Sequence, residues 1–272
     1  MKVFKSSLFY RNTDLYREIS DISIMFNSIY NRENIIQDDI FYIAKNYARK
    51  KEVELELLRI PIDDNELWAF TFVKNNIIFV CINANLPLNK EIFAMAHELY
   101  HIYCYMEKDS SLVLNGSTVL QSEVFNNNEK CIEDLEANAF AGLLLMPKEA
   151  IITQMDIYGI NSSNIKIDDV IKLMDIFAVP YRAAVLRLIE SEIIYVKQGE
   201  ELLKYSSEEV ESRIDLTGVA KRWQLDSRNM ISFGTLRENM EFNKENDVVL
   251  ESRYENDEKY ISEIMVSLIG VK

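Results

Sequence analysis

Histidine and cysteine are both scarce in this chain of 272 residues. It has two histidines, His97 and His101, and three cysteines, Cys81, Cys104 and Cys131. The cysteines are odd in number, widely spaced and without a CxxC pair, which argues against the disulfide framework of a small secreted protein. The sequence therefore predicts reduced thiols, as expected of a cytoplasmic protein.

Long apolar runs are also missing. No stretch of about 18 apolar residues occurs, so the sequence predicts no membrane-spanning helix. The first ten residues contain two lysines but lack the apolar segment and small-residue cleavage site of a secretion signal. These absences agree with the cysteine content and predict a cytoplasmic location without membrane contact.

Basic residues are fewer than acidic residues. The chain has 44 acidic and 30 basic residues, which gives a net charge of −14. Binding to a phosphate backbone needs neutralisation by lysine or arginine, so no direct contact with nucleic acid is expected. A basic protein is the better electrostatic match as a partner. With 48% hydrophobic residues, the chain has ample material for the core of a globular protein.

Hydrophobic periodicity predicts an α+β fold, with a small, mainly antiparallel sheet packed on helices. The expected strands are 53–57, 67–73 and 77–83, with a further strand near 112–120 inside a long polar loop. The expected helices are 14–30, 36–50, 88–107, 129–146 and 168–190, the last one broken at 178–180. A final amphipathic helix has an apolar stripe formed by Ile261, Ile264, Met265, Leu268 and Ile269.

The motif with the clearest chemistry is His97-Glu98-Leu99-Tyr100-His101, an HExxH sequence in the middle of the predicted helix 88–107. Four residues turn a helix by about 400°, so both imidazoles project from one face. Two neutral imidazoles at this spacing can bind one Zn²⁺ ion at roughly 2.0–2.1 Å. Glu98 would then serve as the general base for hydrolysis by an activated water.

A third ligand must be an acid or a thiol, because the chain has no third histidine. The predicted helix 129–146 offers Cys131, Glu133, Asp134 and Glu136. Asp134 and Asn138 are four residues apart and share a face, where Asn138 could orient a ligand carboxylate. Cys131 shares the face of Asp134. Helical spacing alone leaves these candidates open.

Two segments resemble the ImmA/IrrE family of zinc metallo-endopeptidases. They are residues 93–101, FAMAHELYH, and residues 136–147, EANAFAGLLLMP, together with Asn83. Two separated motifs in the correct order are more specific than HExxH alone. The resemblance covers about residues 36–190 and implies a zincin-like metallopeptidase domain over 1–190. Residues 191–272 are then a mainly helical C-terminal extension, a candidate for substrate recognition or sensing.

The resemblance also implies a site and a substrate. His97 and His101 would bind one zinc ion per chain, although another divalent ion fits the same residue types. Glu98 would be the catalytic base. Asp134 stands where the family usually has a glutamate ligand, and Glu133 is the alternative third ligand. The implied substrate is a helix-turn-helix transcriptional repressor.

Tyr100 replaces the glycine that usually precedes the second histidine of the family, which puts a large side chain against the neighbouring structure.

A non-catalytic rival function is a metal-stabilised module that binds and sequesters a repressor, but an intact Glu98 argues against it. A second rival, a DNA-binding regulator with a vestigial peptidase domain, conflicts with the acidic charge. The sequence predicts no particular oligomeric state.

Overall fold

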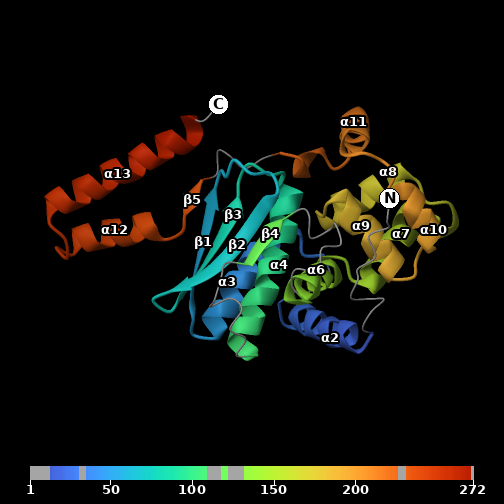
Figure 1. The fold of residues 1–272 in the computed structure, drawn as a ribbon, viewed down its shortest axis with the longest axis horizontal. Coiled ribbons are helices and arrows are strands. Elements are labelled where there is room, and N and C mark those ends of the chain that lie inside the picture. The colour runs from blue at the N-terminus through green and yellow to red at the C-terminus, as the bar shows by residue number, and fades with distance from the viewer. Residues whose placement is uncertain (1–12, 31–34, 109–117, 122–131, 226–230, 271–272) are drawn as a thin grey trace.

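The computed structural model describes residues 13–30, 35–108, 118–121, 132–225 and 231–270 (Figure 1). A mixed sheet lies at the centre, and most of the remaining described residues are helical. The predicted α+β class with a helical C-terminal region is confirmed. Among the described residues, none of the helices combines the length and the apolar character that crossing a membrane requires.

The sheet has the strand order β4-β2-β3-β1-β5. The strands are β1 (Glu54–Ile60), β2 (Leu67–Lys74), β3 (Ile77–Asn83), β4 (Thr118–Gln121) and β5 (Ser232–Phe233). β2 and β3 form a hairpin whose turn residues, Asn75 and Asn76, have φ angles of 52° and 64°. Asparagine tolerates this left-handed region well, which explains the tight two-residue turn.

Three of the four strand pairings are antiparallel, as the sequence predicts, but β1 and β3 pair in parallel. The parallel register runs from Glu54 beside Ile77 to Ile60 beside Asn83. It arises because β3 inserts between β1 and β2, so these two strands, which follow each other in the chain, are not neighbours in the sheet. Asn83, the last residue of β3, joins β3 to the connection between β1 and β2, because its side-chain amide donates to the carbonyls of Asp64 and Leu67.

The helix α4 (Leu88–Glu107) packs against one face of the sheet through β2 and β3. It starts after Pro87, whose φ of −57° suits the entry to a helix. Every residue from Glu91 to Ile102 is buried, because the sheet and neighbouring helices enclose this helix on several sides. The helices that enclose it with the sheet are α3 (Ile40–Lys50) and α6 (Ile132–Leu145), and α2 (Thr13–Tyr30) packs on α6.

A second group of helices packs beyond α6 (Figure 1). Its members are α7 (Lys148–Tyr158), α8 (Ile167–Phe177), α9 (Tyr181–Glu190), α10 (Val196–Leu202) and α11 (Ser207–Thr217). The predicted break before Pro180 is present, with Ala178 in the left-handed region. Short 3-10 helices are η1 (Gln37–Asp39), η3 (Ser162–Asn164) and η4 (Lys221–Trp223).

The core continues past residue 190. Side chains buried in the same core cluster come from α10, α11 and the segments that follow them, namely Leu202, Leu203, Val210, Ile214 and Trp223. The indole of Trp223 also donates to the carbonyl of Asp175 on α8. The division of the chain at residue 190 stays a prediction, and this packing provides a means of testing it.

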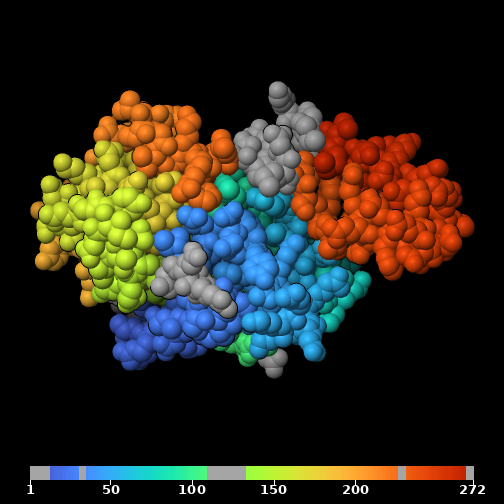
Figure 2. Space-filling model, turned by 180° about the vertical axis from the view of Figure 1, so that it is seen from behind, coloured from blue at the N-terminus to red at the C-terminus, as the bar shows by residue number. Residues whose placement is uncertain are grey.

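The last two helices, α12 (Leu236–Glu245) and α13 (Glu251–Gly270), form an arm at one end of the molecule. Figure 2 shows this arm in orange and red, opposite the end formed by α7 to α11. It joins the sheet through β5, and Thr235 donates to the carboxylate of Glu56 on β1. Of the predicted apolar stripe, Ile261 is buried and Ile264 and Met265 are half-buried. The side chains of Leu268 and Ile269 lie outside the described residues.

Candidate metal centre

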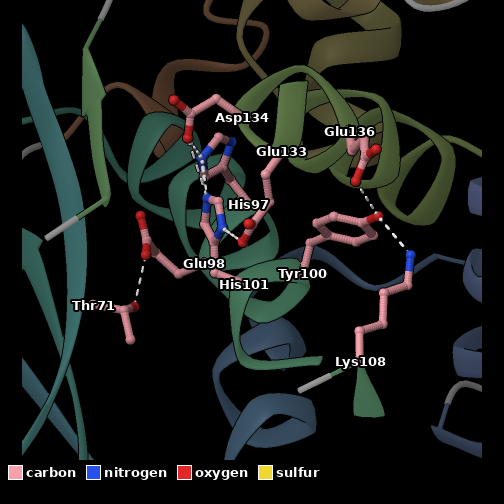
Figure 3. A network of polar contacts seen from close by, with 9 residues as sticks. All are labelled: Thr71, His97, Glu98, Tyr100, His101, Lys108, Glu133, Asp134 and Glu136. Carbon is pink, nitrogen blue, oxygen red and sulfur yellow. Dashed lines mark hydrogen bonds and ion pairs between the residues drawn. The ribbon is translucent and has the colours of Figure 1, made fainter. Parts of the chain in front are cut away.

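The two histidines of the motif face each other on α4 (Figure 3). Their Nε2 atoms lie 3.1 Å apart, and both side chains are fully buried. Successive turns of an α-helix bring residues four apart to the same face, so this placement follows from the sequence spacing. Two buried ring nitrogens so close together need a proton or a cation between them.

Asp134, from α6, completes the cluster. Its Oδ1 atom lies 3.4 Å from His101 Nε2 and 3.9 Å from His97 Nε2. Ligand atoms bound tetrahedrally to zinc at roughly 2.0–2.1 Å are about 3.4 Å from one another, close to these separations. Asp134 Oδ1 is buried and has no hydrogen-bond partner among the described residues. His97, His101 and Asp134 therefore form a set that could hold a metal ion.

The remaining nitrogens of the two imidazoles are also engaged. His97 Nδ1 lies 3.0 Å from Asn138 Oδ1, and His101 Nδ1 lies 2.6 Å from Glu133 Oε1. An acceptor at Nδ1 fixes the tautomer that leaves Nε2 free to bind a metal. Glu133 thus contacts the nitrogen of His101 that points away from the cluster.

Two other candidates, Asn138 and Glu136, have definite places. Asn138, which helical spacing associated with a ligand carboxylate, contacts His97. Glu136 accepts a hydrogen bond of 2.7 Å from the hydroxyl of Tyr100. Cys131 lies outside the described residues.

The electrostatics of the site favour a bound cation. Burial, and then the charge of His101, lowers the pKa of His97 to about 3, so this imidazole is neutral. Burial also acts to lower the pKa of His101, but the carboxylates of Asp134 and Glu133 outweigh it and raise the pKa to about 9. In the absence of a metal the site therefore holds a proton, which a divalent ion must displace on binding.

Glu98 lies beside the cluster and does not belong to it. Its carboxylate is fully buried, and burial raises its pKa to about 7, against the opposing effects of His101 and Thr71. The Thr71 hydroxyl donates to Oε2 over 2.6 Å, whereas Oε1 has no hydrogen-bond partner among the described residues. A carboxylate with a pKa near neutrality and one free oxygen suits general base catalysis.

Thr71 was not predicted from the sequence. It lies on β2 and is buried on the face of the sheet that packs against α4. The available signal was a polar residue at a position where the strand presents apolar side chains to the helices. That signal is weak, because a buried threonine often bonds only to nearby backbone.

Tyr100 points away from the histidines, into the interface between α4 and α6 (Figure 3). Its ring packs against Phe140, with the ring centroids 5.4 Å apart, and Lys108 donates to its hydroxyl over 3.5 Å. The large side chain that replaces glycine therefore contributes to helix packing on the side away from the metal cluster.

Comparison with protein families agrees with this geometry. The family model for peptidase M78, described as the IrrE N-terminal-like domain, matches residues 50–188, just over half of the chain. The chain belongs to this family. It is therefore a metallopeptidase, and the resemblance predicted from the two motifs is confirmed. The matched segment includes β1 to β3, α4, α6 and every residue of the cluster. No curated protein matches the chain.

Proposed function

We propose that this metallopeptidase is a zinc-dependent endopeptidase that cleaves a regulatory protein, most specifically a helix-turn-helix transcriptional repressor. The observation that supports catalysis best is the convergence of His97, His101 and Asp134 beside Glu98. The ligand atoms have tetrahedral spacings, and the adjacent base has one free oxygen. A binding module would need the first feature but not the second.

In the proposed reaction, His97, His101 and Asp134 would hold the ion. When bound, zinc would supply a Lewis acid for the scissile carbonyl and would lower the pKa of a bound water. Glu98 accepts the proton of the nucleophilic water on its free Oε1 and returns it to the leaving amine. Burial of the Glu98 side chain acts to raise its pKa, which favours acceptance of this proton. Asn138 and Glu133 keep the two imidazoles aligned.

The substrate and location rest on other support. The resemblance to the ImmA/IrrE family suggests the repressor, and the net charge of −14 suits a basic, DNA-binding substrate better than DNA itself. A cytoplasmic location, in keeping with a role in transcription regulation, is supported by Cys81 and Cys104, which are buried free thiols. The arm α12–α13 and the helices α10–α11 are candidates for substrate recognition or sensing.

The proposed function can be tested without knowing the substrate. Purified protein is loaded with zinc, and its metal content is measured by elemental mass spectrometry beside His101→Ala. We expect about one zinc per chain, lost in the variant. The zinc-loaded protein is then incubated with a peptide library from digested cytoplasmic extract, and new N-termini are identified by mass spectrometry. Glu98→Gln should keep its zinc and produce none.

The same variant separates the enzyme from the rival binding module. Purified helix-turn-helix repressors are mixed with the wild type and with Glu98→Gln. An endopeptidase cleaves its substrate as wild type and only binds it as Glu98→Gln. Binding by both proteins, with no new N-termini from either, would establish sequestration instead.

A further inference from the structure

The sheet restrains Thr71 from both sides of its strand. Its strand β2 lies between β3 and β4, and Thr71 pairs with Val80 on one side and Thr118 on the other. Both neighbouring strands therefore restrain its backbone. Threonine is β-branched, which also restricts rotation of its side chain. The hydroxyl is thus held by the sheet and not by the helix that contains the histidines.

The contact between Thr71 and Glu98 is short and buried. Thr71 Oγ1 lies 2.6 Å from Glu98 Oε2, and both residues are fully buried. This distance is typical of a hydroxyl that donates to a carboxylate, which is among the stronger hydrogen bonds in proteins. In Figure 3, Thr71 and the two histidines lie on different sides of the Glu98 side chain.

One carboxylate oxygen is occupied and the other is free. Because Oε2 accepts from Thr71, this oxygen is restrained from the sheet, and Oε1 is left without a partner among the described residues. A buried carboxylate oxygen without a donor is costly unless another group completes it. In the reaction above, that group is the nucleophilic water.

We propose that Thr71 is a positioning residue for catalysis, whose hydroxyl orients Glu98 so that Oε1 faces the nucleophilic water. This inference rests on the proposed function. Thr71 contacts none of the three residues of the metal cluster in the interactions described, so the proposal predicts an effect on the base and not on the metal. A purely structural role, in which Thr71 only satisfies a buried carboxylate, predicts no selective effect on groups bound beside Glu98.

The test compares three substitutions at this position. Thr71→Val and Thr71→Ala both remove the hydroxyl, and the alanine variant adds no methyl group against the carboxylate. Thr71→Ser keeps the hydroxyl and is the matched control. Each protein is loaded with zinc, its thermal unfolding is recorded, and its zinc affinity is measured by competition with a chromophoric chelator.

The probe is acetohydroxamate, which chelates zinc and presents an acidic hydroxyl to a neighbouring carboxylate. Its dissociation constant is measured by calorimetry, so the result does not depend on a known substrate. We expect Thr71→Val and Thr71→Ala to bind acetohydroxamate roughly tenfold more weakly than wild type, the size expected for a lost contact to a charged group. Glu98→Gln should show a similar loss. Thr71→Ser should stay within about twofold, and zinc affinity should be unchanged throughout.

Other outcomes overturn the proposal. Acetohydroxamate affinities equal to wild type in the valine and alanine variants, with zinc bound, would remove Thr71 from the positioning of Glu98 and leave the proposed function intact. Equal losses in all three variants, serine included, would show a packing role. If the wild type itself binds no zinc, the proposed function fails, and the role of Thr71 fails with it.

Discussion

At the scale of single residues, each imidazole of the centre uses its two nitrogens differently. The Nε2 atoms of His97 and His101 face each other, 3.1 Å apart, and their Nδ1 atoms contact Asn138 and Glu133. Orienting groups of this kind typically change metal affinity by about 10-fold to 100-fold when they are removed. A direct ligand contributes more, because its loss leaves only two protein ligands. The two effects are therefore separable by measurement.

This difference decides between Asp134 and Glu133 as the third ligand. We predict that Asp134→Ala binds no zinc after dialysis, because the cluster loses the carboxylate oxygen nearest to both Nε2 atoms. Glu133→Gln should keep about one zinc per chain with roughly 10-fold to 100-fold lower affinity, because only the contact to His101 Nδ1 weakens. Metal content and chelator competition measure both results.

Glu136→Gln is the matched control, since Glu136 lies on the same helix and contacts Tyr100. Its zinc affinity should equal that of the wild type. The opposite pattern, with zinc retained by Asp134→Ala and lost by Glu133→Gln, would make Glu133 the third ligand and would require α6 to rotate.

The parts of the site that could be predicted are those set by local geometry. The spacing of His97, Glu98 and His101 along one helix determines their relative placement, whatever surrounds it. The choice between Glu133 and Asp134 depends on tertiary structure, because adjacent helical residues differ by about 100° in direction. Only the packing of α6 on α4 decides which of them faces the histidines. The contact of Thr71 with Glu98 could not be predicted from the sequence, because it joins a strand to a helix and depends on how the two pack together.

At the scale of elements, the position of α4 over the sheet depends on a buried ion pair. Arg59 on β1 donates to Glu91 in the first turn of α4 through Nε over 3.0 Å and through a terminal nitrogen over 2.6 Å. The side chains are 12% and 0% exposed, so the pair is nearly removed from water. Losing one partner from such a pair is far more costly than losing a surface pair.

We predict that Arg59→Met lowers the free energy of unfolding by about 3 kcal/mol, because the buried Glu91 carboxylate loses the charge and both hydrogen bonds of Arg59. The double variant Arg59→Met, Glu91→Leu should recover most of this loss, since both charges of the pair are then removed. Urea denaturation of the zinc-free proteins measures both.

Lys204→Ala serves as the control, because Lys204 and Glu201 form an ion pair with side chains 65% and 61% exposed. Its unfolding midpoint should not change. If Arg59→Met also leaves the midpoint unchanged, the ion pair does not hold α4 on the sheet.

The elements themselves were largely predictable from periodicity, and their arrangement was not. The apolar helix around the HExxH motif and the break before Pro180 are visible in the sequence because local pattern and proline geometry decide them. The parallel pairing of β1 with β3 was not predicted. A short connection between strands suggests adjacent antiparallel partners, and nothing in the pattern of β1 and β2 indicates that β3 lies between them.

At the scale of the whole molecule, the helices after residue 190 belong to two different environments. α10, α11 and η4 contribute buried side chains to the main core, whereas α12 has no buried residue. The arm is joined to the sheet by the short pairing of β5 with β1 and by the hydrogen bonds of Thr235 to Glu56. Removing the arm should therefore affect the core much less than removing α10 and α11.

Two truncations test this difference. A chain that ends at residue 225 keeps the core and loses β5 and the arm, so we expect a cooperative unfolding transition and about one bound zinc. A chain that ends at residue 190 loses six large side chains of the core cluster: Ile194, Leu202, Leu203, Val210, Ile214 and Trp223. At about 1.5–3 kcal/mol each, these amount to roughly 10 kcal/mol, which is comparable to the whole stability of a typical domain.

We therefore predict that the chain ending at residue 190 aggregates or unfolds without a cooperative transition, as judged by gel filtration and urea denaturation. Its exposed surface would be the side of α8 and α9 that α10 and α11 normally cover. A chain ending at 190 that is monomeric, unfolds cooperatively and binds zinc would support a division at residue 190 and make α10 and α11 part of a separable extension. If the chain ending at residue 225 also fails to unfold cooperatively, the arm stabilises the sheet as well. Among the described strands, only β5 pairs with the edge of β1 that faces away from β3.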